Sequence, residues 1–196
     1  MSQPTDSNLA KSIIAISGLN LALSYENAAI DRLENRLSEC IVPEVKEKIK
    51  RHLEQTKDQQ KRLQERISAL GGEITVEKGH LPIPEPPHSI KGLIESHSTD
   101  REREVWESLN DLIIERAEYI MYRGGIQALE LLEADKKTIK TLEKILKEEK
   151  AFGDWLEKNN PKIAKRLMTK QLFDEKKRSK KKKAEDKSEV HETLSA

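Results

Sequence analysis

Four glutamates occupy positions at which a packed helix normally carries apolar side chains. Glu26 and Glu149 each interrupt an apolar stripe in mid-helix. A third helical segment carries Glu115 and Glu118, one turn apart. Carboxylates are rarely buried without a partner, because removing a charge from water is costly. Carboxylate oxygens from several helices also bind iron or manganese in helical bundles, so these residues predict a carboxylate metal site.

The second helical segment is polar on the side that should face a core. His52, Thr56 and Gln59 stand at core-spaced positions within HLEQTKDQQKRL (52–63). Imidazole and amide groups hydrogen-bond to carboxylates, so this side is predicted to face a chamber lined by the glutamates. An alternative needs no metal: these polar groups, together with Arg116 and water, would satisfy the carboxylates in an apo bundle.

Four long helices must position these groups. Apolar residues recur at three- and four-residue steps in four segments, which is the spacing of one face of a helix. The predicted helices span about residues 8–40, 43–70, 98–133 and 135–158. Short links join the first pair and the last pair, whereas a proline-rich connection over 73–99 joins the second helix to the third. Such a crossover is typical of a ferritin-like four-helix bundle, so the predicted fold class is all-α, with the bundle over 8–159.

The heights of the polar residues can be compared because a helix rises about 1.5 Å per residue. We count residues from the short link at the end of each helix pair. On this count three glutamates lie within about one turn of a common level along the bundle: Glu26, Glu118 and Glu149. At that level the second helix offers Gln55 and Asp58. Ferritin-like di-metal sites use a glutamate from each of two helices and Glu-x-x-His from the other two, and neither histidine is present here. The candidate ligands are therefore Glu26, Gln55, Asp58, Glu115, Glu118 and Glu149. Their oxygen atoms favour iron or manganese, with a bundle that holds no cofactor as the alternative.

The composition restricts the remaining possibilities. Charged residues make up 36% of the 196 residues and aromatic residues 4%, which favours long helices. The single cysteine, Cys40, has no partner for an intramolecular disulfide, so a reducing, cytoplasmic location is expected. Residues 9–25 are fairly apolar but interrupted by polar side chains, so we expect a core helix and neither a membrane span nor a signal peptide. No nucleophile–base pair or phosphate-binding glycine loop is recognisable, and whether the protein is an enzyme stays open.

Charge is distributed unevenly along the chain. The net charge is +1, but residues 161–196 contain twelve Lys or Arg and six Asp or Glu, so the first part of the chain is acidic. A short amphipathic helix is predicted over 160–173 and a disordered basic tail over 174–196, and residues 1–7 are expected to be flexible. The run KKRSKKKK (Lys176–Lys183) is predicted either to contact nucleic acid nonspecifically through phosphates or to remain solvated.

Four segments of the chain together resemble one family. They are YENAAIDRL (25–33), PEVKEKIKRHLEQTKDQQKRL (43–63), ERAEYIMY (115–122) and ILKEEKAFGDWL (145–156). By their order and spacing, the chain resembles the ferritin-like stress proteins typified by YciE and YciF. The resemblance implies a ferritin-like bundle, a homodimer, a link to stress responses and a metal site. The residues that match that site are Glu26, Glu115, Glu118 and Glu149, while Gln55 stands where the family usually has glutamate.

Two functions are consistent with these residues. The first is a metal-handling protein with a partly degenerate carboxylate site, for which peroxide- or oxygen-dependent iron oxidation is the expected activity. The second is a non-enzymatic helical scaffold or architectural protein whose basic tail contacts nucleic acid or a partner. The glutamates favour the first function, whereas Gln55 and the basic run favour the second.

Overall fold

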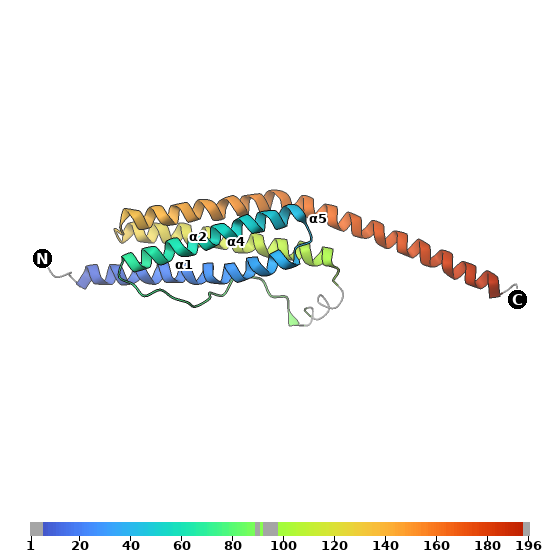
Figure 1. Cartoon of the computed structure of the whole chain (residues 1–196), viewed down its shortest axis with the longest axis horizontal. Coiled ribbons are helices and arrows are strands. Elements are labelled where there is room, and N and C mark those ends of the chain that lie inside the picture. The colour runs from blue at the N-terminus through green and yellow to red at the C-terminus, as the bar shows by residue number, and fades with distance from the viewer. Residues whose placement is uncertain (1–5, 89–90, 92–97, 194–196) are drawn as a thin grey trace.

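The computed structural model describes residues 6–88, 91 and 98–193. Within this part of the chain, four long helices form an elongated bundle (Figure 1). They are α1 (Asp6–Glu39), α2 (Pro43–Ala69), α4 (Asp100–Leu131) and α5 (Lys136–Thr193). α1 packs mainly on α2, and α4 on α5; α2 also contacts α5, while α1 and α4 touch least. The predicted all-α bundle with a long connection between α2 and α4 is confirmed.

Local sequence signals set where the helices begin and end. Pro43 occupies the first turn of α2, where its missing N–H costs no intrahelical bond. After α2, Gly71 has a φ of 76°, a left-handed conformation that residues with a Cβ rarely adopt. At α4 the Thr99 hydroxyl accepts a hydrogen bond from the Glu102 N–H, and the Glu102 carboxylate accepts one from the Thr99 N–H. This capping box confirms the predicted start of the helix.

The connection between α2 and α4 is held along the outside of α1. Asn20 and Asn27 donate side-chain hydrogen bonds to loop carbonyls at 2.8 and 2.9 Å. The Gly79 N–H donates to a carbonyl of α1 at 2.7 Å. These bonds satisfy a proline-rich segment that has no regular partner of its own. The parts of the predicted connection at 89–90 and 92–97 lie outside the described residues.

The last helix is longer than predicted. We expected a break before a short helix over 160–173 and a disordered tail over 174–196, but α5 continues through Pro161 without a break. Proline removes one helical hydrogen bond and clashes with the preceding turn, at a cost of about 3 kcal/mol in a helix interior. Burial of apolar side chains beyond the proline offsets this cost, as does a hydrogen bond at 2.6 Å from the Asn160 amide to a carbonyl of α4.

α1 is the most apolar of the helices. Its segment Leu9–Glu39 is, among the described residues, the one helix long and apolar enough to cross a membrane by length and composition. Of the apolar window, 44% is buried inside the bundle, and the buried side of the helix carries Glu26 and Arg36. The core helix of a bundle meets the same criteria. Residues 1–5 of the predicted flexible N-terminus and 194–196 of the predicted tail lie outside the described residues.

Two apolar layers form the core, one toward each end of the bundle. The layer nearer the α4–α5 turn includes Leu19, Leu23, Leu63, Tyr122 and Ile145. The layer nearer the α1–α2 turn includes Leu33, Val45, Ile49, Phe152 and Leu156. Burial of these side chains holds the helices in register, so that the polar residues between the layers meet at one level.

Candidate metal centre

All four helices bring buried polar groups to the level between the two apolar layers. The acidic groups are Glu26 from α1, Glu115 and Glu118 from α4, and Glu149 from α5. The groups from α2 are His52, Thr56 and Gln59. None of these seven residues, which we call the carboxylate centre, is more than 3% exposed. The structure therefore brings together the glutamates that helical rise predicts at one level, and the polar side of α2 faces them.

His52 lies beside two of these glutamates. Its Nε2 atom is 3.2 Å from Glu115 Oε1 and 3.5 Å from Glu149 Oε2. Each of the three side chains offers one ligand atom, and these atoms lie within 4.8 Å of one another. Phe152 packs against the imidazole, with 4.2 Å between the ring centroids. One imidazole and two carboxylates thus converge within reach of a single metal ion.

Neighbouring side chains orient the carboxylates. The Tyr122 hydroxyl donates a hydrogen bond to Glu26 Oε1. The Gln59 amide donates to Glu149 Oε1 and, at 3.2 Å, to Glu148 Oε2 at the rim. Gln59 reaches one oxygen of Glu149, and the other oxygen, Oε2, has no hydrogen-bond donor. Side chains of the protein therefore hold the carboxylates in place without using all of their hydrogen-bonding capacity.

Burial keeps the acidic groups protonated near neutral pH. Loss of hydration raises the pKa of Glu26 to about 8, and repulsion from Glu149 adds to the shift. Burial likewise raises the pKa of Glu149 to about 8, against the opposing effect of His52. The pKa values of Glu115 and Glu118 also lie well above their usual range, mainly because of burial. At neutral pH the centre is thus a set of carboxyl groups that retain protons.

Several polar atoms of the centre have no hydrogen-bond partner. They are His52 Nδ1, Gln59 Oε1, Glu115 Oε2, Glu118 Oε1 and Glu149 Oε2. Buried polar atoms in folded proteins almost always have a partner. Retained protons let Glu149 share hydrogen bonds with Glu115 and Glu118, so these glutamate oxygens lack partners once the carboxyl groups ionise. A divalent cation coordinated by carboxylate oxygens and an imidazole would supply partners and offset the charge of the ionised glutamates. The residues present therefore fit a metal ion.

Two predicted ligands lie outside the carboxylate centre. Gln55 and Asp58 are both exposed, and the Asp58 carboxylate forms an ion pair with Arg62 at 2.9 Å. They lie on the outer side of α2, because Thr56 and Gln59 take the inward positions one residue further along. A shift of one residue turns a helical side chain by about 100°, which is enough to move it from the core to the surface. Gln59 therefore supplies the amide that was expected from Gln55.

His52 was predicted to face the chamber but was not among the predicted ligands. The stripe along α2 predicts that it faces inward, but a search for Glu-x-x-His favours Gln55, one turn further on. Arg116, which the metal-free alternative assigns to the centre, lies toward the surface. Its guanidinium pairs with Asp154 at 2.9 Å, and its side chain is 30% exposed. The imidazole, and no arginine, is therefore the basic group among the seven residues of the centre.

The fold and the centre together define a protein in which four helices converge on a buried histidine–glutamate group. Residues 16–169 match the model of a family described as a domain of unknown function, DUF892. The chain therefore belongs to the DUF892 family, which is the YciE/YciF-type family.

Two solved structures share this fold. The protein XCC3681 from Xanthomonas campestris pv. campestris aligns with a TM-score of 0.66 and 19% identity, over 83% of this chain and 99% of its own. YcfI from Rhodopseudomonas palustris aligns with a TM-score of 0.61 and 21% identity, over 75% of this chain and 92% of its own. At these identities the likeness establishes the fold alone. No curated protein matches the chain.

Proposed function

We propose that the carboxylate centre binds a divalent iron or manganese ion, and that handling of this ion is the function of the protein. His52, Glu115 and Glu149 are the first ligands, because their ligand atoms lie closest together. Glu26 and Glu118 face the same space and supply further carboxylate oxygens. When bound, the ion supplies Lewis-acid or redox chemistry; the chain supplies the ligands and excludes water.

The observation that carries this proposal is the set of unpartnered oxygens on three buried glutamates. Glu115, Glu118 and Glu149 each hold one oxygen without a hydrogen bond, in a group whose net charge would be strongly negative if all ionised. Mixed carboxylate and imidazole ligands suit iron and manganese better than softer metals. A purely structural cluster would be expected to pair its carboxylates with arginine or lysine.

The raised pKa values imply that the ion competes with protons. Glu26 and Glu149 have pKa values of about 8, so an incoming cation must displace protons from them at neutral pH. Metal affinity therefore rises with pH through this range. Burial disfavours the ionised carboxylates more than His52, Gln59 and Tyr122 favour them, and a bound cation reverses this balance, so deprotonation and metal binding are coupled.

Metal analysis with a matched pair of variants tests the proposal. Untagged protein is loaded with Fe(II) without oxygen or with Mn(II), desalted, and analysed for metal content and melting temperature. We expect about one ion per chain, a higher melting temperature with metal, and loss of both effects in Glu149→Gln. Asp58→Asn, which removes an exposed carboxylate at the same level of α2, should bind metal normally. Metal content near zero in the unsubstituted protein, or equal loss in both variants, contradicts the proposal.

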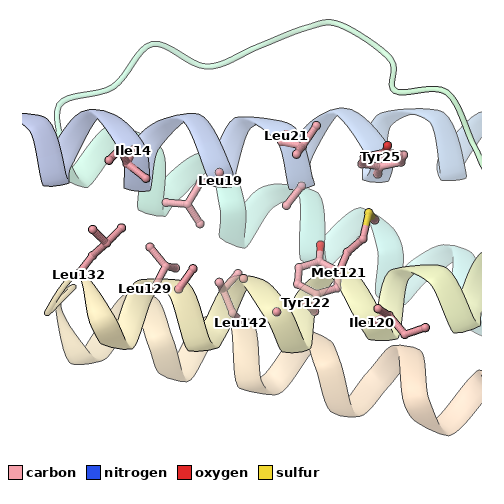
Figure 2. Close-up of a pocket in the computed structure, with 15 residues that line it drawn as sticks. Ile14, Leu19, Leu21, Tyr25, Ile120, Met121, Tyr122, Leu129, Leu132 and Leu142 are labelled. Carbon is pink, nitrogen blue, oxygen red and sulfur yellow. The ribbon is translucent and has the colours of Figure 1, made fainter.

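A second proposal concerns the side on which α1 and α4 touch least. An apolar groove of about 380 Å³ lies there, and Figure 2 shows it between Leu21 and Tyr25 of α1 and Ile120 and Met121 of α4. Leu21 and Ile120 are 58% and 67% exposed. We propose that a second copy of the chain covers this groove, because a twofold interface joins the same apolar patch of two chains.

The mass of the protein in solution tests this homodimer. Light scattering after gel filtration should give a dimer for the unsubstituted chain and a monomer for the double variant Leu21→Glu, Ile120→Glu. Val76→Glu is the matched control, because Val76 is also exposed and apolar but lies in the connection after α2. A monomeric unsubstituted protein at about 50 μM, a concentration at which stable interfaces of standard size stay associated, contradicts the proposal.

A further inference from the structure

The last part of α5 projects beyond the bundle. Gln171 is the last buried side chain among those described, and the Asp174 carboxylate accepts a hydrogen bond from Arg101 of α4 at 2.8 Å. Figure 1 shows the helix continuing past the ends of α1, α2 and α4. Residues 176–181 are all exposed. A helix without neighbours gains no stability from packing, so its side chains require another explanation.

The charge on this segment is unusually dense. Seven of the eight residues in Lys176–Lys183 are Lys or Arg, and none is acidic. At about 1.5 Å per residue the segment is about 12 Å long, so it carries one positive charge per about 1.7 Å. Duplex DNA carries one negative charge per about 1.7 Å of its axis. The segment and a duplex therefore match in charge density and are opposite in sign.

We propose that the helical segment Lys176–Lys183 binds duplex nucleic acid through its phosphates, without reading the base sequence. The segment contains no aromatic residue on which a base could stack and no Asn or Gln that could pair with adenine. Because seven of its eight residues are cationic, we assign most of its side chains to phosphates and not to guanine edges. The side chains of residues 176–181 follow one another around the helix at about 100° steps, which suits contact with the two phosphate rows of a groove. This function is separate from the carboxylate centre and does not depend on metal.

Repulsion inside the segment also favours a polyanionic partner. Like charges four residues apart destabilise a helix, and the segment contains three such pairs: 176 with 180, 177 with 181, and 178 with 182. Phosphates placed between these cations remove the repulsion, so binding should make the segment more helical. A membrane surface is a poorer match, because membrane-bound helices have an apolar face and Lys176–Lys183 has no apolar residue.

The residues after the basic segment oppose this binding. Residues 184–193 contain four Asp or Glu and one Lys. Glu185 and Asp186 follow Lys181 and Lys182 by four residues, the spacing at which a helix pairs opposite charges. Because their negative charges follow the basic segment directly in the sequence, neutralising Glu185 and Asp186 should strengthen binding.

Fluorescence anisotropy with a labelled 24-base-pair duplex of arbitrary sequence tests the proposal on the full chain. We expect micromolar binding at 50 mM salt and a slope of log K against log salt of about −3 to −5, because part of the seven cations can reach phosphates at one time. The test variant changes four cations of the segment: Lys176→Gln, Lys177→Gln, Arg178→Gln and Lys180→Gln. This variant should bind the duplex at least about tenfold more weakly. The magnitude of its slope of log K against log salt should be smaller by about two to three.

A matched control uses four exposed lysines on the bundle part of the same helix. The substitutions are Lys136→Gln, Lys137→Gln, Lys140→Gln and Lys147→Gln. This control has the same net charge as the test variant and should keep the affinity within about twofold, because the proposal gives these lysines no phosphate contact. Equal loss in both variants would show that net charge alone is responsible, and would overturn the proposal.

Three further measurements separate the alternatives. Glu185→Gln with Asp186→Asn should bind the duplex about threefold more tightly or better, because two opposing charges are gone. Duplex RNA should bind within about threefold of duplex DNA, since both present phosphates at similar density; a tenfold preference would indicate groove readout and overturn a phosphate-only contact. Binding to vesicles with 30% anionic lipid, together with no binding to either duplex, would assign the segment to membranes instead.

Hydrogen exchange gives a readout that does not depend on affinity. Amides of residues 176–183 should exchange more slowly when the duplex is added, whereas amides of the bundle should be unchanged. Protection confined to the bundle, or absent, contradicts the proposal.

Discussion

Two buried polar clusters in the bundle balance their charges in opposite ways. The arginine cluster, near the α1–α2 turn, consists of Arg32, Arg36, Glu104, Glu107 and Asp111. Arg36 is 1% exposed and donates hydrogen bonds at 2.9 Å to both Glu104 and Asp111. Burial opposes its charge, but Asp111 and Glu104 outweigh that effect and raise the pKa of Arg36 above its ordinary value. In this cluster the chain supplies its own positive charge.

The carboxylate centre lacks such a residue. Its four glutamates share one imidazole, and no Lys or Arg is among its seven members. His52, with Arg62 and Arg116 farther out, offsets part of this negative charge. The rest is balanced by protons at low pH or by a metal ion at higher pH. The comparison indicates that the arginine cluster serves the fold, whereas the carboxylate centre keeps a place for a ligand.

The largest expected effect follows from removing the arginine from the balanced cluster. Arg36→Met leaves Glu104 buried without its arginine and leaves Asp111 with Arg32 alone, which should lower the free energy of unfolding by about 3–5 kcal/mol. Arg116→Met breaks an exposed pair with Asp154 and should cost about 1 kcal/mol or less. Urea denaturation of both variants measures the difference. Similar losses in the free energy of unfolding for Arg36→Met and Arg116→Met would contradict a stabilising role for the arginine cluster.

Metal addition should stabilise the protein next most strongly, and more at high pH. Saturating Mn(II) at about 100 times its dissociation constant corresponds to about 2.7 kcal/mol of added stability. The increase in melting temperature should be larger at pH 8 than at pH 6, because the glutamates with a pKa of about 8 then release protons more readily. Thermal melts with and without Mn(II) at both pH values measure this increase. An equal increase in melting temperature at pH 6 and pH 8 contradicts the coupling of metal binding to proton release.

Without metal, stability should fall as pH rises from about 5 to 9. Glu26 and Glu149 bind protons up to a pH of about 8 in the folded state but only to about 4.5 when unfolded. The folded state therefore holds more protons in this window, and raising the pH favours unfolding. Glu149→Gln should flatten this dependence and stabilise the metal-free protein at pH 8.5 by about 1–2 kcal/mol. Urea denaturation in EDTA measures both, and an unchanged pH profile would count against the raised pKa values.

The smallest effect is expected at the position that sequence reasoning favoured. Gln55→Glu restores the residue usual in the family, but Gln55 is exposed on the outer side of α2. The substitution should change the free energy of unfolding by about 0.5 kcal/mol or less and leave metal content unchanged. Metal analysis beside the unsubstituted protein measures it. A clear rise in metal content would place residue 55 in the centre and undo the assignment of His52.

The sequence was sufficient for the level of the centre and for the side of α2 that faces it, but the Glu-x-x-His pattern selected Gln55 and Asp58, which lie on the other side. Level depends on rise per residue, which every helix shares, so Glu26, Glu118 and Glu149 could be aligned by counting. The side depends on how α2 rotates about its axis when Val45 and Ile49 pack into the core, both with 0% exposure. That rotation is a property of the whole bundle. The stripe along α2, which includes residue 52, identified the inward residues correctly, whereas the Glu-x-x-His pattern did not.

The continuity of α5 could not be predicted for a related reason. Pro161 is a strong local signal for a helix end, because its cost arises within one turn. The opposing contribution comes from Ile163 and Leu167, which are 5% and 8% exposed. They belong to the same core layer as the side chains around the α1–α2 turn. Tertiary contacts of this kind are not visible in a local window of sequence, although the four helices themselves follow from their periodic apolar residues.

The stretch of α5 from Pro161 onward also gives the molecule a large electric dipole moment, to which residues 161–171 beside the bundle contribute +4 and residues 172–196 contribute +2. With +6 on residues 161–196 and +1 on the whole chain, residues 1–160 carry −5, and Figure 1 shows that the C-terminal end lies far from the bundle. A nearly neutral protein of this kind behaves as an acid at one end and a base at the other. It should adhere to both anion- and cation-exchange resins at pH 7 and low salt, and it should approach any polyelectrolyte end-on.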